Sequence, residues 1–180
     1  TGEEMKAAGR NYLASMGIYI FNRKLMFDML QTEFKDATDF GKEIIPQSIN
    51  KYKVASYQYD GYWTDIGNIY SFFEANLGLT ADIPDFNLFD NDNAIYTRAR
   101  MLPPAKISGS TLEKTIIAEG CIINASRIEN SVIGIRTRIG VGTTIVSSYV
   151  MGGDFFETLE EMKHNAERGI PKLGIGDRCY

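Results

Sequence analysis

The 180-residue chain has few of the residues that build metal clusters, disulfide frameworks or membrane spans. It contains one histidine, His164, and two cysteines, Cys121 and Cys179, which are far apart and form no CxxC motif. This cysteine usage fits a reduced, cytoplasmic setting. No apolar run approaches the roughly 18 residues that a membrane span needs. The N-terminal Thr-Gly-Glu-Glu has neither the basic start nor the apolar segment of a secretory signal.

An excess of positive charge is also missing. The chain has 19 basic and 23 acidic residues, for a net charge of -4. Without a basic stripe to neutralise phosphates, nucleic acid is not expected as a partner. What is present is apolar material: hydrophobic residues make up 44% of the chain, enough for one or two small cores, which excludes disorder as the main state.

The first part of the chain predicts mixed helices and strands. Residues 12–21 are rich in Tyr, Ile and Phe and predict a buried strand. Asn22 can cap a helix that follows. Four apolar residues at helical spacing are expected on its inner face: Leu25, Met26, Met29 and Leu30. A second short helix is expected over residues 40–48, opened by Thr38 or Asp39.

A hairpin and a further helix are expected next. Residues 54–59 and 62–64 have strand composition, and Asp60-Gly61 between them is a strong turn signal. Asp65 then precedes a predicted helix over residues 66–79. Its inward positions are Ile69, Phe72, Phe73, Asn76 and Leu77. Residues 80–104, rich in turn formers but with interspersed aromatics, are expected to form a connector packed on a domain.

After Pro104 the apolar residues recur every six positions, with one five-residue step. The positions are Ile116, Ile122, Ile128, Ile133, Ile139, Ile145 and Met151, with Gly, Asn or Ser between them. This spacing predicts a β-solenoid in which each short strand points one aliphatic side chain inward. The alternative is an antiparallel meander with irregular turns. Residues 154–169 are expected to be an excursion from the solenoid, which resumes at residues 174–177.

Several segments, taken in order, resemble one enzyme family. They are Ala14-Ser15-Met16-Gly17-Ile18-Tyr19, Asp39-Phe40-Gly41, Gly61-Tyr62-Trp63-Thr64-Asp65-Ile66-Gly67, Phe72-Phe73-Glu74-Ala75-Asn76-Leu77, Leu102-Pro103-Pro104-Ala105-Lys106, Ile133-Gly134-Ile135-Arg136 and Met151-Gly152-Gly153-Asp154. The chain resembles the glucose-1-phosphate adenylyltransferases, also called ADP-glucose pyrophosphorylases, over nearly all of its length.

The resemblance implies an α/β fold, a partial Rossmann-like nucleotidyltransferase domain, followed by a left-handed parallel β-helix. The implied limits are residues 1–80 for the C-terminal part of the catalytic domain, 81–104 for the connector and 105–180 for a truncated β-helix. The family makes ADP-glucose and pyrophosphate from ATP and α-D-glucose 1-phosphate with Mg²⁺, for glycogen or starch synthesis. The family works as a tetramer under allosteric control, and for this protein a homotetramer is expected.

The chain also departs from the family pattern. The Gly-rich nucleotide loop, the first metal-binding Asp and the Glu-Lys pair that holds the sugar phosphate are expected before Thr1. We therefore expect a C-terminal portion of the enzyme that lacks its N-terminal nucleotide-binding half and is inactive alone.

The resemblance also implies roles for individual residues. Asp65 would be one of two carboxylates that hold the catalytic Mg²⁺; its alternative role is to cap the following helix. The implied glucose 1-phosphate contacts are Ser15, Gly17, Tyr19, Asp39, Phe40 and Trp63. For Ser15 the alternative is a bond to backbone, for Asp39 it is helix capping, and for the two large aromatic rings it is core packing.

Three other side chains are candidates for binding or catalysis. Arg136 and Arg138 alternate with Thr and Ile, which places both on one face, where paired guanidinium groups suit an anion. By resemblance Arg136 lies near an allosteric anion site; the alternative is a solvated pair. His164 would be catalytic in a hexapeptide acyltransferase, but it lies in a charged stretch outside the repeat. Another sugar-nucleotide pyrophosphorylase or a non-catalytic regulatory paralogue also remains open.

Overall fold

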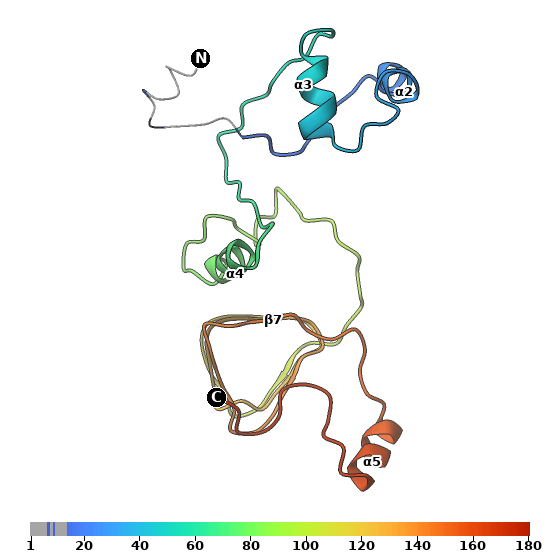
Figure 1. Ribbon diagram of the computed structural model, residues 1–180. Helices are drawn as coiled ribbons and strands as arrows, with labels where there is room; N and C mark the ends of the chain where they lie inside the picture. Colours follow the sequence, from blue (N-terminus) through green and yellow to red (C-terminus); the bar gives the residue numbers. More distant parts are fainter. Residues whose placement is uncertain (1–6, 8, 10–13) are drawn as a thin grey trace. The chain divides into compact units, whose positions relative to one another are not determined.

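The computed structural model describes residues 7, 9 and 14–180, and these divide into two compact units (Figure 1). The first unit comprises residues 1–59 and the second residues 60–180. Each unit is described by itself. The domain limits at residues 80 and 104 stay predictions.

The described part of unit 1 contains three short helical elements. These are α2 (Arg23–Gln31), the π-helical turn η1 (Phe40–Ile44) and α3 (Ile45–Ser48). The predicted cap is confirmed, because Asn22 Oδ1 accepts the Leu25 backbone N–H at 3.2 Å. The second predicted helix is also confirmed, with Asp39 as its cap. Met29, Phe34 and Ile44 form the buried core of this unit.

The strand predicted over residues 12–21 is wrong where it can be tested. Tyr12 and Leu13 lie outside the described residues, and residues 14–21 form no strand. The side chains of Ile18 and Ile20 are 74% and 98% exposed. A segment with the composition of a strand does not form one by itself, because a β-strand needs a neighbouring strand to which its backbone can hydrogen-bond. No strand of unit 1 within the described residues offers one.

The predicted hairpin around Asp60-Gly61 is also wrong. Neither residues 54–59 nor residues 62–64 form a strand, and the boundary between the two units falls between Tyr59 and Asp60. A two-stranded hairpin is marginal in water unless a third strand or a helix packs against it. The turn chemistry was therefore insufficient evidence for pairing.

Helix α4 (Ile69–Gly78) is confirmed, but it begins three residues later than predicted. Asn68, rather than Asp65, caps it by accepting the Ser71 backbone N–H at 2.9 Å. Ile69 in the first turn is exposed, so its predicted inward position is wrong. The other four predicted inward residues, Phe72, Phe73, Asn76 and Leu77, are half-buried. Among the described residues, no helix is long and apolar enough to cross a membrane.

The connector after α4 contains no helix or strand before residue 106. Its packing is limited: the ring of Phe86 stacks on Tyr62 with centroids 6.0 Å apart, whereas Phe89 and Tyr96 are largely exposed. The expected tethered connector is therefore attached near its start and again at its end, where the Pro103 carbonyl accepts the Gly120 backbone N–H at 2.7 Å.

The predicted solenoid is confirmed as a parallel β-helix. Its strands are β1 (Lys106–Ile107), β2 (Thr111–Ile117), β3 (Ile122–Ile123), β4 (Arg127–Ile133), β5 (Arg138–Ile139), β6 (Thr144–Val146) and β7 (Tyr149–Val150). Strands β1, β3 and β5 form one parallel sheet, and β2, β4 and β6 form a second, in which β7 also pairs with β4. Residue 106 pairs with residue 122, which pairs with residue 138, so one coil takes 16 residues. Viewed along the stack, the coils outline a triangle (Figure 1).

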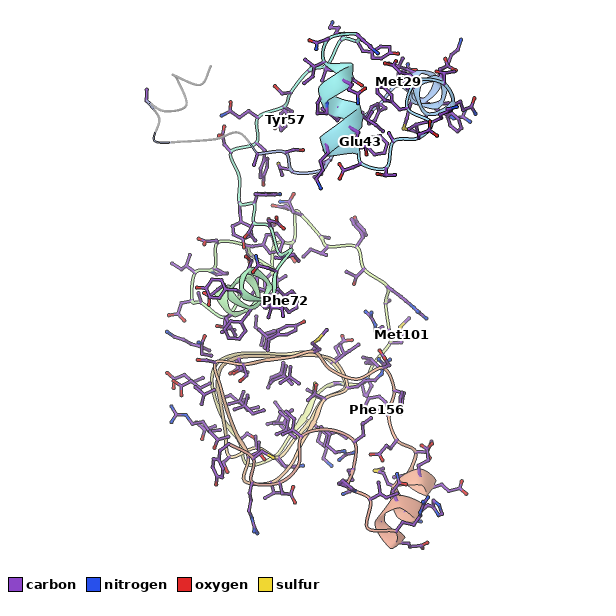
Figure 2. The ribbon with its side chains drawn as sticks, viewed as in Figure 1. Met29, Glu43, Tyr57, Phe72, Met101 and Phe156 are labelled. Atoms are coloured by element: carbon purple, nitrogen blue, oxygen red, sulfur yellow. The ribbon has the colours of Figure 1, made fainter. Side chains whose placement is uncertain are left out.

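The core of the β-helix is a column of small and aliphatic side chains that fill the triangle (Figure 2). Its buried members are Cys121, Ile123, Ala125, Ile128, Ile133, Ile139 and Ile145. The predicted column is thus correct from Ile128 to Ile145. Ile116 and Ile122 are only half-buried, because coils of 16 or 17 residues do not hold a strict six-residue phase.

Met151 is the clear error in the predicted column. Its side chain is 78% exposed. The following Gly152 has a φ of 92°, in the left-handed region that glycine favours, and there the chain turns out of the coil.

The predicted excursion and return are confirmed. Helix α5 (Leu159–Glu167) opens with a capping box between Thr158 and Glu161. The chain then rejoins the stack where Ile175 forms a parallel bridge with Ile139. Glu157 ties the two ends of the excursion, accepting from Asn165 Nδ2 at 3.2 Å and from the Leu173 backbone N–H at 2.7 Å.

Ile133→Ala should destabilise the β-helix by about 2–5 kcal/mol, because it removes a fully buried side chain and leaves a cavity. Met151→Ala, at the position that the six-residue period also placed inside, should change stability by no more than about 0.5 kcal/mol. Urea unfolding followed by circular dichroism measures both. Equal losses would show that Met151 is buried and that the core assignment is wrong.

The two cysteines should differ in reactivity. Burial raises the pKa of the Cys121 thiol, which is 1% exposed and donates to the Gly134 carbonyl at 3.1 Å, whereas Cys179 is exposed. Because the thiolate is the reactive form, a thiol reagent should label Cys179 in the native protein and both cysteines in denaturant. Rapid native labelling of Cys121 would contradict the buried column.

Candidate functional site

The predicted sugar-phosphate residues of unit 1 are brought together. Ser15 Oγ lies 3.1 Å from Tyr19 Oη and accepts the Gly17 backbone N–H at 3.2 Å. The Tyr19 ring stacks on Phe40, with centroids 6.1 Å apart and planes at 25°. The extended segment after residue 14 therefore lies against the start of η1. It presents hydroxyl groups beside an aromatic surface, a combination that suits a sugar.

Asp39 joins this cluster at the turn before η1. A Cβ on Gly41 would lie 3.4 Å from both Asp39 Oδ1 and Tyr19 Oη, so these polar atoms border the same small residue. Asp39 Oδ1 also accepts the Lys42 backbone N–H at 2.8 Å, which confirms its alternative role as a helix cap. Its second oxygen lies 3.9 Å from Lys42 Nζ, an exposed contact of little energetic weight.

Glu43 is a polar residue of this cluster that the sequence analysis missed. Its Oε1 accepts the backbone N–H groups of Thr38 and Asp39 and the Thr38 hydroxyl, each at 3.0 Å. The pKa of Glu43 is lowered, first by the bonds from Thr38 and also by the bond from Asp39, against the opposing effects of desolvation and the Asp39 charge. An acid one turn after an Asp cap, as in a capping box, is the signal that could have found it.

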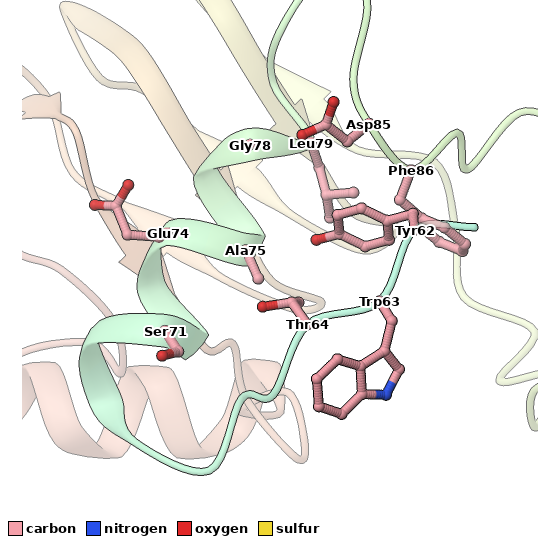
Figure 3. Close-up of a pocket in the computed structure, with 10 residues that line it drawn as sticks. All are labelled: Tyr62, Trp63, Thr64, Ser71, Glu74, Ala75, Gly78, Leu79, Asp85 and Phe86. Carbon is pink, nitrogen blue, oxygen red and sulfur yellow. The ribbon is translucent and has the colours of Figure 1, made fainter. Parts of the chain in front are cut away.

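Two of the predicted residues of unit 2, Trp63 and Asp65, lie on the segment that leads into α4. Trp63, 44% exposed, lines a cavity of about 320 Å³ between this segment, α4 and the connector (Figure 3). Its lining residues are Tyr62, Trp63, Thr64, Ser71, Glu74, Ala75, Gly78, Leu79, Asp85 and Phe86. In Figure 3 the Trp63 ring lies at one side of the cavity, apart from the stacked rings of Tyr62 and Phe86. Trp63 is therefore at the edge of this cavity and not in a packed core.

Asp65 lies two residues beyond Trp63 and is exposed. Its Oδ1 accepts the Gly67 backbone N–H at 2.8 Å, and a Cβ on Gly67 would come within 2.9 Å of that oxygen. The helix-cap alternative for Asp65 is wrong, because the next residues form this tight turn and Asn68 caps α4.

The fit of Mg²⁺ to Asp65 is partial. A carboxylate oxygen is the hard ligand that Mg²⁺ prefers, and one carboxylate with bound water and phosphate is a common arrangement. Across the part of the chain that the structure describes, no three Asp, Glu, His or Cys side chains gather into a metal cluster. Asp65 thus offers one ligand and not a complete site.

Arg136 and Arg138 lie on the same side of the β-helix, as their alternation predicts. Both line a small pocket with residues of the excursion, including Phe155, Phe156 and Leu173. Arg136 Nη1 donates to the Gly153 carbonyl at 3.4 Å, and its guanidinium lies 5.7 Å from the centre of the Phe156 ring. Arg138 Nη2 lies 3.8 Å from the Met162 sulfur. These arginines hold the excursion, so they are not merely solvated; an anion role remains a prediction.

His164 lies on α5, outside the coils, with its Nε2 3.5 Å from Arg168 Nη1. It is exposed and lines neither of the two pockets. The acyltransferase interpretation gains no support from this position.

Glu43 should make the helical turn of unit 1 sensitive to acid. Since its folded pKa lies below the ordinary 4.5, the unfolded chain takes up the proton first as the pH falls. Its stabilisation is complete above the ordinary pKa and is lost as the pH falls through the lower folded value. Glu43→Gln should remove this part of the pH dependence, measured by thermal melts from neutral pH to about pH 3. An unchanged slope in the variant would contradict this role.

Comparison with known proteins adds to this geometry. The family model described as "Nucleotidyl transferase" matches residues 3–82, and the one described as "GLGC left-handed parallel beta-helix domain" matches residues 100–180. The chain is 42% identical over 180 residues to a protein of Triticum aestivum named "Glucose-1-phosphate adenylyltransferase small subunit, chloroplastic/amyloplastic". That similarity covers 99% of this chain and 38% of the relative. Over almost its whole length the chain is therefore similar to a glucose-1-phosphate adenylyltransferase small subunit, and it contains a nucleotidyltransferase segment followed by a left-handed parallel β-helix.

Proposed function

We propose that this chain is part of an enzyme that makes ADP-glucose and pyrophosphate from ATP and α-D-glucose 1-phosphate, in glycogen or starch synthesis. The observation that supports the proposal is that Ser15, Tyr19, Asp39 and Phe40 lie together in unit 1. The chain is also 42% identical to a glucose-1-phosphate adenylyltransferase small subunit. The proposed partners are ATP, glucose 1-phosphate and further copies of the chain in a homotetramer. The proposed location is the cytoplasm.

The chemistry of the cluster suits a hexose phosphate. The hydroxyls of Ser15 and Tyr19 can each donate or accept, and the second carboxylate oxygen of Asp39 can accept from sugar hydroxyls. Phe40, half-buried and stacked on Tyr19, offers apolar surface to a pyranose face. Gly17 has a φ of 72° and open space around it, so a ligand can approach the backbone there. In unit 2, Trp63 is proposed as a further contact to glucose 1-phosphate.

Asp65 is proposed to hold Mg²⁺ through the oxygen that does not accept the Gly67 N–H. Bound there, the cation would neutralise charge on the phosphate oxygens. The turn through Gly67 fixes the direction of the carboxylate before any cation binds. Arg136 and Arg138 are proposed to respond to an allosteric anion, in competition with their contacts to the excursion.

The 180-residue chain, assayed alone, is proposed not to turn over substrate. It spans 38% of the length of the relative it matches, and its described residues provide one candidate metal ligand at the proposed site. Base choice would be tested in a protein of the relatives' full length that contains this chain, with ATP, UTP, GTP and dTTP each paired with glucose 1-phosphate. A preference for another base would identify a different sugar-nucleotide pyrophosphorylase, and no product with any base would favour a regulatory paralogue.

Asp65→Asn in that full-length protein should lower kcat on the order of 100-fold or more, because a neutral amide is a far weaker Mg²⁺ ligand. The Gly67 turn should survive, since the amide oxygen can still accept its N–H. Pyrophosphate release at saturating substrate measures the rate. Asp82→Asn, which changes an exposed acid at the start of the connector, is the matched control. A wild-type rate for Asp65→Asn would remove the metal role.

A further inference from the structure

A chain of side-chain hydrogen bonds joins the end of α4 to one corner of the β-helix. Thr80, 8% exposed, has its Oγ1 2.8 Å from the Leu77 carbonyl oxygen and 3.0 Å from Asn130 Oδ1. Asn130 Nδ2 donates to Ser147 Oγ at 3.1 Å. Asn130 therefore stands between the helix and the next coil of the stack, with both ends of its amide engaged.

The corner at Asn130 has an unusual backbone. Lys114, Asn130 and Ser147 have φ values of 45°, 45° and 44°, and they lie above one another on successive coils. The left-handed region is unfavourable for most residues, but asparagine tolerates it better than other non-glycine residues. Of these three stacked residues, Asn130 alone contacts Thr80 in the described structure.

A second attachment lies about two turns earlier on the same helix. The ring of Phe72 meets Tyr149 of β7 edge-on, with centroids 4.9 Å apart and planes at 89°. Such a pair is directional as well as apolar. Two attachments at different heights hold α4 against both sliding and rotation on β4 and β7.

Hydrogen bonds at the start of α4 link the position of the helix to that of Asp65. The Asn68 side chain binds both the backbone N–H and the hydroxyl of Ser71, each at 2.9 Å. The Asp65 carboxylate is fixed by Gly67, one residue before that cap. The segment from Asp65 to the first turn of α4 therefore has little freedom of its own.

We propose that Asn130 is a positioning residue: by holding Thr80, it fixes α4 on the β-helix and so sets the location of Trp63 and Asp65. This rests on the proposed function insofar as those two residues serve catalysis. Asn130 itself touches no substrate; it acts through the helix.

Fluorescence of the 180-residue chain tests the positioning without any activity. Trp63 is the single tryptophan, so its emission reports this segment alone. Asn130→Gly removes the hydrogen bonds of the Asn130 side chain. Glycine also adopts the left-handed backbone conformation at this position without strain, so the fold should be kept. We expect a shifted emission maximum and stronger acrylamide quenching. Thr80→Val, which cuts the same bond from the other partner at similar volume, should do the same.

Lys114→Gly is the matched control, with the same backbone change at the corresponding corner of the preceding coil. It should leave Trp63 emission unchanged. Unchanged emission in both Asn130→Gly and Thr80→Val would overturn the proposal. A lower melting temperature without any change at Trp63 would overturn it too, because that result means a purely structural role.

Kinetics in the full-length protein give the second readout. Asn130→Gly should lower kcat roughly tenfold, as a small displacement of catalytic groups does, and Asn130→Asp should recover part of the loss by keeping the acceptor for Thr80. An unchanged kcat beside a shifted Trp63 would overturn the link to catalysis. If the wild-type protein makes no ADP-glucose, the proposed function fails, while the fluorescence result still decides the positioning.

Discussion

The rest of unit 2 depends on the stacking of parallel coils around a dry aliphatic column. Ile123, Ile128, Ile133 and Ile139 are completely buried, each contributing roughly 1.5–3 kcal/mol by leaving water. Small polar residues fill the remaining positions and bond to neighbouring coils: the Thr143 hydroxyl donates to the Gly176 carbonyl at 2.8 Å. Because each coil rests on the last, the corners align, and residues far apart in sequence acquire fixed relative positions.

That fixed surface gives α4 its place. An isolated helix of ten residues is marginal in water, and the half-buried face of α4 shows that packing stabilises it. It lies against β4 and β7, where Phe72 packs on Tyr149, and Thr80, just beyond its end, bonds to Asn130. The segment bearing Trp63 and Asp65 has no sheet of its own to hold it, so the position of α4 determines where these side chains lie.

The sequence predicted well whatever depends on local spacing. The Asn22 and Asp39 caps, α4 and the buried isoleucines from 128 to 145 follow from side-chain chemistry and periodicity. The strands expected at residues 12–21 and 54–64 failed where they can be tested, because a strand needs a partner that composition does not supply. Met151 failed because Gly152 turns the chain outward, which a count of six cannot show. At the site, Ser15, Tyr19 and Phe40 lie together, while their binding of a sugar phosphate stays a proposal. The spacing of Glu43 after the Asp39 cap could have revealed its contacts, whereas the contact of Asn130 with Thr80 depends on how the coils stack and could not be read from spacing.

The central proposal is that Asp65 holds a divalent cation near Trp63. Paramagnetic Mn²⁺, which accepts the same oxygen ligands as Mg²⁺, tests it most directly in the full-length protein with the ε-nitrogen of Trp63 labelled. In the presence of ATP, Mn²⁺ should broaden the Trp63 indole signal in the wild-type protein and leave it sharp in Asp65→Asn. Equal broadening in both proteins, or none in either, would contradict the account.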